Sequence, residues 1–378
     1  MPAPLEILTS RLARAQAATA AAGLDVLLLT PSPDLRYLLG VGAESHERLT
    51  CLVLPAQGDP VVVVPALERP GLDGTPALGL GLEIAEWIDG DDPYTLVAGL
   101  LRKSGSAVAR AAVADAMPAA HVLALRAALP GCAQELASTV LAPLRMRKDG
   151  SEIAALVAAG QAIDRVHARM GEWLRVGRTE AQVGADIAAA IVAEGHTGAA
   201  FVIVGSGPHG ASPHHDVSDR VVQPGDVVVV DIGGPTAEGY FSDCTRTYSM
   251  GEPAHADVAT GYAVLQAAQD AAVAAVAPGT TAEQVDAAAR TPITDAGFGE
   301  QFIHRTGHGI GLEVHEQPYI VAGNDLVLEA GMSFSIEPGI YLPGRWGARI
   351  EDIVVVDGQG ARRLNHRPRE LVVLPTAC

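Results

Sequence analysis

The chain has 378 residues and a mass of 38.9 kDa, enough for two domains of ordinary size. Hydrophobic residues make up 48% of the sequence, charged residues 19% and aromatic residues 4%, which excludes a disordered or collagen-like chain and predicts a core of Ala, Val, Leu and Ile. The 26 Lys and Arg residues face 44 Asp and Glu residues, and this net charge of −18 argues against nucleic acids and anionic membranes as partners.

The first 140 residues alternate helix-like and strand-like segments. The predicted elements are a helix over residues 8–22, the strand LDVLLLT (24–30), a turn at 31–34, and the strands LTCLVLP (49–55) and PVVVVP (60–65). This alternation is typical of an α/β layer with a largely buried sheet. No cluster of catalytic residue types occurs in it, so residues 1–140 are expected to form an α/β domain that supplies no catalytic constellation.

The N-terminus and the cysteines favour a reduced, cytoplasmic protein. Residues 1–25 carry Glu6 ahead of the first arginines, which fits an amphipathic helix better than a secretory signal. The longest stretch without Asp, Glu, Lys or Arg, residues 195–215, is rich in Gly, Pro and His, so no transmembrane helix is expected. Four widely spaced cysteines show no pairing pattern and are expected to pack as small apolar side chains: Cys51, Cys132, Cys244 and Cys378.

A junction between two domains is predicted at the segment LAPLRMRKDGSE, residues 141–152. Asp149 and Glu152 have the spacing of a helix capping box. A long helix should follow, because apolar residues recur on one helical face: Ile153, Leu156, Val157, Ile163, Val166, Met170 and Trp173. The second domain is therefore placed at residues 145–378.

A weak internal repeat runs through this second domain. Residues 176–195 and 278–297 match at a constant offset of 102, and each segment opens a predicted helix with a threonine cap, Thr179 and Thr281. Chance alignment in a chain rich in Gly and Ala is the alternative. Otherwise the domain is a duplicated helix-helix-strand unit.

The repeat also relates four carboxylates. At an offset of 106 the apolar runs VVVVD and SFSIE end in Asp231 and Glu337, and at an offset of 108 Asp243 corresponds to Glu351. A carboxylate beside a buried strand is costly unless a cation compensates it. Duplication would therefore bring two carboxylates from each half to one cleft, together with a positive charge.

Six of the twelve histidines lie in two glycine-rich windows. Glycine lets the backbone approach an ion or a substrate closely, so these windows are candidates for a functional site. Their histidines are His209, His214, His215, His304, His308 and His315. Four carboxylates and one imidazole suit two divalent ions of the Mn, Fe, Co or Zn type. Two such ions about 4 Å apart can hold both the attacking and the leaving atom of a hydrolysis.

These motifs resemble the pita-bread metallopeptidases, which include Xaa-Pro dipeptidase (prolidase), aminopeptidase P and methionine aminopeptidase. Residues 1–140 are similar to the creatinase-type N-terminal domain, and residues 145–378 to the α+β pita-bread catalytic domain. The resemblance implies two divalent ions, Mn, Co or Zn, with manganese expected. The implied ligands are Asp231 in VVDIGG, Asp243 in SDCTRT, His308 in TGHGIG, Glu337 in SIEPG and Glu351 in RIED.

The resemblance also implies catalytic roles. His214 in SPHHDVSDR and His315 in EVHE would bind the substrate carbonyl or the tetrahedral intermediate, and Glu337 would relay a proton. A one-residue shift makes His215 the alternative to His214. His304 is a candidate for substrate binding, with a structural role as its alternative.

Two further features bear on the site. Arg349 lies two residues before Glu351 and resembles the arginine that binds the substrate carboxylate or supports the ligands, with an exposed surface cation as the alternative. Asp231 and Asp243 are 12 residues apart, one more than in most members. The extra residue falls in the turn GGPTAEGY, so the ligands should still converge, while the shape of the hairpin stays open.

The implied function is hydrolysis of the Xaa-Pro bond of dipeptides or short peptides by a cytoplasmic homodimer, in which the N-terminal domain of one subunit walls the cleft of the other. Dipeptidase and aminopeptidase both remain open. The main alternative is an inactive pita-bread module that binds peptides or proteins, although such modules lose their carboxylates. A creatinase-like C–N hydrolase and a methionine aminopeptidase fit less well, because the former lacks the acidic set and the latter usually lacks the N-terminal domain.

Overall fold

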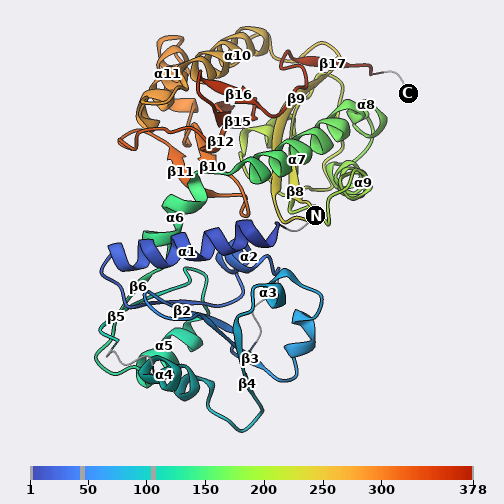
Figure 1. Cartoon of the computed structure of the whole chain (residues 1–378). Helices are drawn as coiled ribbons and strands as arrows, with labels where there is room; N and C mark the ends of the chain where they lie inside the picture. Colours follow the sequence, from blue (N-terminus) through green and yellow to red (C-terminus); the bar gives the residue numbers. More distant parts are fainter. Residues whose placement is uncertain (1–2, 43–46, 104–107, 377–378) are drawn as a thin grey trace. The chain divides into compact units, whose positions relative to one another are not determined.

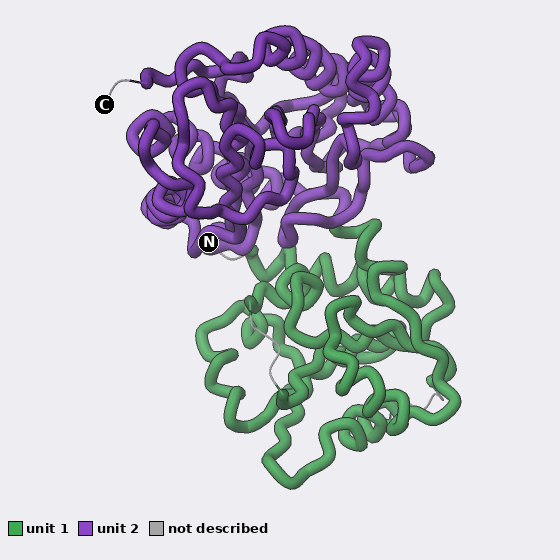
Figure 2. Tube along the Cα trace, turned by 180° about the vertical axis from the view of Figure 1, so that it is seen from behind, with its two compact units in different colours: residues 1–145 green, residues 146–378 purple. Residues whose placement is uncertain are grey.

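The computed structural model describes residues 3–42, 47–103 and 108–376. It divides into two compact units, Met1–Arg145 and Met146–Cys378 (Figure 2). Cys51, Cys132 and Cys244 are buried free thiols, as expected, while Cys378 lies outside the described residues. Among the described residues no helix has both the length and the apolar character needed to cross a membrane.

The first unit contains a mixed six-stranded sheet with the order β4-β3-β2-β1-β5-β6 (Figure 1). Every residue of β1, β2 and β3 is buried, as their apolar runs predict. The strands are β1 (Val26–Leu29), β2 (Cys51–Pro55), β3 (Val61–Pro65), β4 (Glu83–Trp87), β5 (Arg110–Val113) and β6 (Ala133–Leu136). The helices are α1 (Leu5–Ala21), α2 (Pro33–Leu39), η1 (Arg69–Leu72), α3 (Pro76–Gly79), α4 (Pro93–Lys103), α5 (Ala119–Ala128) and α6 (Ser138–Met146).

The turn predicted at residues 31–34 is instead the start of helix α2. The segment 31–34 leads directly into α2, because the Ser32 side chain accepts a hydrogen bond from the Leu35 amide and Pro33 occupies the first helical position. Both features stabilise a helix N-terminus.

The second unit opens with α7 (Gly150–Ala168), which begins at the predicted capping box of Asp149 and Glu152. The single long helix expected through Trp173 is interrupted: α7 ends at Ala168, and a short helix α8 (Met170–Trp173) follows. Arg169 leaves helical geometry between them, so the apolar positions after Ala168 belong to a separate turn.

Two sheets form the body of this unit. One has the order β17-β9-β8-β7 and the other β11-β10-β12-β15-β16, and β13 and β14 form a separate hairpin. The first half contains α9 (Glu180–Ala193), β7 (Phe201–Ser206), η2 (Gly207–Ala211), β8 (Val227–Pro235) and β9 (Phe241–Met250). The second half contains α10 (Val258–Ala275), α11 (Ala282–Asp295), η3 (Gly299–Gln301), β10 (Gly307–Gly309), β11 (Glu316–Ile320), β12 (Ser333–Ile336), β13 (Gly339–Leu342), β14 (Trp346–Arg349), β15 (Asp352–Val356), β16 (Ala361–Arg363) and, returning to the first sheet, β17 (Val372–Leu374).

The two halves repeat one another, as the sequence offset predicts. Thr179 and Thr281 each form a capping box at the start of α9 and α11. Each half also has its own apolar core: α7 and α9 pack on the sheet of β7, β8 and β9, and α10 and α11 pack on the sheet that contains β12 and β15 (Figure 1). Asp231 and Asp243 lie on strands β8 and β9, Glu337 directly follows β12 and Glu351 directly precedes β15, which places the candidate site where the halves meet.

His167 of α7 is buried against strand β9, in the sheet of β7, β8 and β9. Its Nδ1 lies 2.9 Å from the Tyr248 hydroxyl and its Nε2 lies 3.0 Å from the Cys244 carbonyl oxygen. Burial, followed by the positive charge of Arg246, lowers the pKa of His167 from 6.5 to about 3. The folded chain therefore holds this imidazole neutral at a pH where the unfolded chain protonates it.

We predict that His167 makes the second unit less stable as the pH falls from 6.5 toward 3, because only the unfolded state binds the proton in this range. The contribution is up to about 1.4 kcal/mol per pH unit. Urea unfolding of the metal-free wild type and of His167→Gln measures it. The variant should be less stable at neutral pH but should show a flatter pH dependence. Parallel stability curves for the two proteins would contradict the assignment.

Candidate metal centre

The hairpin of β8 and β9 places two of the acidic residues on one face. Asp231 pairs with Thr245, and Asp243 pairs with Gly233, so the two carboxylates are diagonal neighbours. The longer spacing is absorbed in the turn 236–240, which the amide of Thr236 closes by donating to the Tyr240 carbonyl. The hairpin therefore remains regular despite the extra residue.

His308 comes from the short strand β10, where two glycines are required by close packing. A Cβ atom on Gly307 would lie 1.8 Å from the Ser335 carbonyl oxygen, and one on Gly309 would lie 2.1 Å from that of Gln317. Only glycine fits on either side of His308. The TGHG pattern thus reflects a strand pressed between β11 and β12 with its imidazole directed at the carboxylates.

Glu337 and Glu351 follow β12 and β14 and are tied in place by hydroxyl groups. The Ser335 hydroxyl donates to Glu337 over 3.0 Å, and the Thr245 hydroxyl donates to Glu351 over 2.8 Å. The Glu351 amide also donates to the Thr245 carbonyl. Thr245 therefore joins the strand of Asp243 in the first half to the Glu351 segment of the second.

The structure brings all five sequence-predicted ligands together, four of them buried and Glu337 partly exposed. Nε2 of His308 lies 3.1 Å from Glu337 and 3.5 Å from Asp243, and one donor atom each of Asp243, His308 and Glu351 lie within 4.8 Å of one another. Nδ1 of His308 is 3.1 Å from the Gly309 carbonyl oxygen. A neutral imidazole has a single N–H, so these contacts on both ring nitrogens need either a second proton or a metal ion at Nε2.

The carboxylates have the electrostatics of a cation site. Oδ1 of Asp231 and Oε1 of Glu351 are buried without a hydrogen-bond partner. Burial and then the negative charge of Glu351 raise the pKa of Asp243 well above its usual range, and burial and then Glu337 raise the pKa of Glu351 in the same way. Divalent ions would satisfy the two oxygens and reverse both shifts, so the residues fit the metals that the sequence predicts.

Arg349 is 2% exposed, which excludes the alternative of a surface cation. Its Nη2 lies 2.6 Å from Oδ2 of Asp231, and its Nε donates to the Thr245 hydroxyl over 3.1 Å. Its Nη1 donates to the Tyr341 hydroxyl over 2.7 Å. Most of its N–H groups are therefore used to orient Asp231 and the residues around it.

Asp231, Asp243, His308 and Glu337 form one wall of a cavity of about 820 Å³, while Glu351 is buried behind them. The other walls carry His214, His304 and His315, together with the apolar side chains of Phe201 and Val314. Burial and then the charge of His308 lower the pKa of His315 to about 4, and burial also lowers the pKa of His304. Both imidazoles are thus neutral near pH 7, and the ring nitrogens of His304 already contact the Arg305 carbonyl oxygen at 2.6 Å and the Tyr341 hydroxyl at 2.9 Å.

The two adjacent histidines of the SPHH segment have different surroundings. Both line the cavity, but Nε2 of His215 is engaged by Glu180 over 2.8 Å, whereas His214 is exposed. Sequence reasoning overlooked Tyr341, whose hydroxyl contacts both Arg349 and His304, and also overlooked Thr245. Strand alternation could have found Thr245, because it lies two residues after Asp243 on the same face.

Comparison with known proteins places the chain in a family. The model for metallopeptidase family M24 matches residues 154–358, and the model for the creatinase/prolidase N-terminal domain matches residues 11–147. The chain belongs to metallopeptidase family M24. Its family and its predicted fold class, a creatinase-type domain followed by a pita-bread domain, are thereby confirmed.

Similar proteins span the full length of this M24 peptidase. It is 61% identical over 372 residues to the protein named Probable dipeptidase PepE of Mycobacterium tuberculosis, and the match covers 98% of each chain. The crystal structure of dipeptidase PepE from Mycobacterium ulcerans is 60% identical, with a TM-score of 0.94 over 99% of this chain and 100% of that one. The Xaa-Pro dipeptidase of Lactobacillus delbrueckii subsp. lactis is 38% identical over 358 residues, 93% of this chain and 96% of that protein.

We predict that Thr245→Val weakens divalent metal binding by about 10- to 100-fold, because it removes the hydroxyl that orients Glu351 and accepts from Arg349 while keeping the side-chain shape. Equilibrium dialysis of the metal-stripped protein against Mn²⁺ measures the change. Thr291→Val on the exposed face of α11 is the matched control and should bind like the wild type. Equal affinities of Thr245→Val and the wild type would contradict this role.

Proposed function

We propose that this M24 peptidase is a dinuclear metal-dependent dipeptidase that hydrolyses the Xaa-Pro bond. The observation that carries the proposal is the convergence of four carboxylates and His308: Asp231, Asp243, Glu337 and His308 line the cavity, Glu351 lies buried behind them, and two carboxylate oxygens have no hydrogen-bond partner. The names of the relatives, dipeptidase and Xaa-Pro dipeptidase, support the same reaction and substrate class.

The proposed metal ligands are the five that the sequence predicts: Asp231, Asp243, His308, Glu337 and Glu351. Manganese is the proposed ion, since oxygen-rich donor sets with one imidazole accept it readily. When bound, the ions supply the Lewis acidity that activates water and polarises the scissile carbonyl. Arg349 holds Asp231 in position for them through its 2.6 Å ion pair.

The chain's own residues then handle the proton and the developing charge. Burial opposes ionisation of Glu337, but the hydrogen bond and charge of His308 outweigh it and lower the pKa of Glu337 to about 2. Glu337 would be kept ionised by bound cations in place of His308, so that it could accept a proton from the attacking water and pass it to the leaving proline nitrogen. His214 and His315 donate hydrogen bonds to the carbonyl oxygen as it gains negative charge.

The remaining walls of the cavity suit a short proline-containing peptide. Phe201 and Val314 offer an apolar surface for the proline ring, and His304 and Arg349 are the proposed contacts for polar groups of the substrate. The Tyr341 hydroxyl lies within hydrogen-bond distance of both His304 and Arg349, which fixes their relative positions. We propose dipeptides as the main substrates and longer Xaa-Pro peptides as the alternative.

The compartment and the assembly belong to the same proposal. The free buried thiols of Cys51, Cys132 and Cys244 suit a reducing environment, which supports a cytoplasmic location. A homodimer is proposed from the resemblance to peptidases of this type. In such a dimer the first unit of one subunit would wall the cavity of its partner and restrict access to short peptides.

We predict that chelation abolishes hydrolysis of Xaa-Pro dipeptides and that Mn²⁺ restores it, because the buried carboxylates cannot activate water without a cation. Metal-stripped protein reloaded with Mn²⁺, Co²⁺ or Zn²⁺ is assayed on Xaa-Pro, Xaa-Pro-Xaa and Met-Ala peptides. Glu337→Gln should lower kcat on Xaa-Pro by at least about 100-fold.

The substrate panel separates the possible failures. Hydrolysis that survives chelation would refute the metal mechanism. Cleavage of Met-Ala alone would refute the substrate class while leaving the chemistry intact. Peptide binding without turnover under any metal would favour the inactive binding module.

We predict that His214→Ala lowers kcat by about 100-fold or more with a smaller change in KM, because the lost hydrogen bond acts mainly in the transition state. Steady-state kinetics of the manganese-loaded variant on Xaa-Pro measure the effect. His366→Ala, a change of an exposed histidine, serves as the control and should match the wild type. A kcat of His214→Ala within a few-fold of the wild type would remove His214 from the mechanism.

A further inference from the structure

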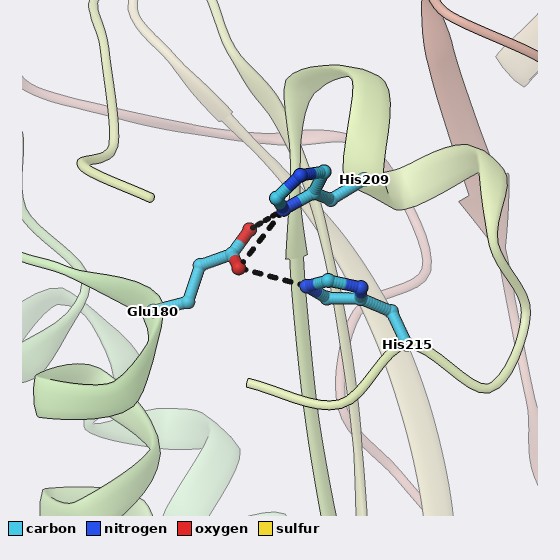
Figure 3. Close-up of side chains that lie close together, drawn as sticks. All are labelled: Glu180, His209 and His215. Carbon is cyan, nitrogen blue, oxygen red and sulfur yellow. Dashed lines mark hydrogen bonds and ion pairs between the residues drawn. The ribbon is translucent and has the colours of Figure 1, made fainter. Parts of the chain in front are cut away.

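A second cluster of metal-ligating side chains lies beside the catalytic cavity. Glu180, the first residue of α9, faces His209 of η2 and His215 of the segment that follows it (Figure 3). Nδ1 of His209 lies 3.1 Å from Oε2 of Glu180, and Nε2 of His215 lies 2.8 Å from the same oxygen. These three residues are named the Glu180 cluster below.

The carboxylate of this cluster is buried and held in a fixed orientation. The Glu180 side chain is 0% exposed. It accepts hydrogen bonds from the amide and hydroxyl of Ser206 and from the hydroxyl of Ser218, at 2.6 to 2.8 Å. Although burial opposes ionisation, the hydrogen bonds from Ser206 and Ser218 outweigh it and lower the pKa of Glu180 to about 2. Hydrogen bonds of this kind commonly fix the carboxylate ligand of a metal ion.

The other half of the domain shows what a purely structural carboxylate looks like here. Asp286 of α11 accepts hydrogen bonds from the amide and hydroxyl of Thr306, much as Glu180 does from Ser206. Asp286 is neutralised by a two-bond ion pair with Arg290, at 2.9 Å each. Among the described residues no Lys or Arg forms an ion pair with Glu180. Its ion-pair partners are two imidazoles, which are metal ligands as well as hydrogen-bond donors.

Two of the three donor-atom distances are close to the spacing that a zinc ion requires, and all three donor atoms lie within 4.8 Å of one another. Bonds of 2.0 to 2.1 Å to tetrahedral zinc place its ligand atoms about 3.3 Å apart. The contacts of Glu180 with His209 and His215 are 3.1 and 2.8 Å, so shifts of a few tenths of an ångström suffice. The ring centroids of the two histidines are 4.3 Å apart, and both rings point at the carboxylate (Figure 3).

The cluster is open to solvent on one side, which gives an ion access and leaves one coordination position for water. The His209 side chain is 38% exposed, so an ion can enter from that side and keep a water molecule as its fourth ligand. Nε2 of His209 and Nδ1 of His215 have no hydrogen-bond partner among the described residues. Each can carry the ring proton when the opposite nitrogen binds a metal ion.

We propose that Glu180, His209 and His215 form a second metal centre, separate from the five-ligand centre, that takes a single ion of the Zn²⁺ type. Two imidazoles and one carboxylate favour zinc over calcium or magnesium, which prefer oxygen ligands. The ion ties η2 and the following segment to the start of α9. Because His214 belongs to that segment, the ion also anchors one wall of the cavity.

The test is a zinc count on the full chain. Metal-stripped wild type, His209→Ala and His366→Ala are dialysed against Zn²⁺, and bound zinc is measured by elemental analysis. We expect the wild type and His366→Ala to hold one more zinc per chain than His209→Ala. Equal zinc content in the wild type and His209→Ala would overturn the proposal.

The measured difference in zinc content must not depend on zinc bound in the catalytic pocket, or on misfolding of η2 and the following segment in His209→Ala. The same comparison is therefore repeated with Asp243→Asn and Glu351→Gln added to every protein. Loss of zinc from the five-ligand centre lowers the zinc content of all the proteins equally. The expected difference of one zinc per chain is then unchanged. Crystals of the zinc-loaded wild type provide the second measurement. An anomalous peak between Glu180, His209 and His215 supports the site. If zinc gives an anomalous peak in the catalytic pocket but none between these three residues, the proposal is overturned. This measurement uses the wild type alone and so does not depend on the folding of His209→Ala.

Discussion

Buried negative charge is the constraint on which the catalytic unit depends. Each carboxylate in the pocket raises the free energy of ionising its neighbours, and burial adds to that cost, which is why the pKa values of Asp243 and Glu351 are raised. Arg349 offsets the charge of Asp231 but leaves one oxygen of Asp231 and one of Glu351 unpaired. Divalent cations would compensate this buried negative charge. The unpaired carboxylate oxygens therefore favour binding of the metal ions on which the chemistry of the family depends.

Duplication explains how one chain assembles such a group. Each half supplies one carboxylate after an apolar run, Asp231 in the middle of β8 or Glu337 directly after β12, and a second, Asp243 or Glu351. The halves are not equal, because a tight turn separates the first pair, whereas the β13 and β14 hairpin separates the second. At the repeat offset, His308 corresponds to Ser206. The single imidazole of the centre therefore breaks the symmetry between the two halves.

The capping boxes and the glycine-rich windows could be predicted because each is encoded in a few consecutive residues, whereas the strand expected to end at Asp231 continues to Pro235. Contacts between distant segments could not be predicted: Thr245 with Glu351, and Tyr341 with Arg349, follow from the pairing of the halves. Strands β4, β5 and β6 were also missed, since sequences such as AQEL lack the apolar run that marked β1 to β3. The start of α2 is hard to predict for a different reason, because Ser32 and Pro33 are typical of a turn and also of a helix cap.

The segment that carries His214 is fixed from two sides. At one end, Gly210 packs so closely on β14 that a Cβ atom on Gly347 would lie 1.9 Å from the Gly210 carbonyl oxygen. At the other end, His215 is held by Glu180. With both ends fixed, His215 is committed to the Glu180 cluster and His214 remains available to the cavity. Both histidines line the cavity, but Glu180 engages Nε2 of His215, so a carboxylate at the start of α9 distinguishes two adjacent residues that the sequence alone leaves equivalent.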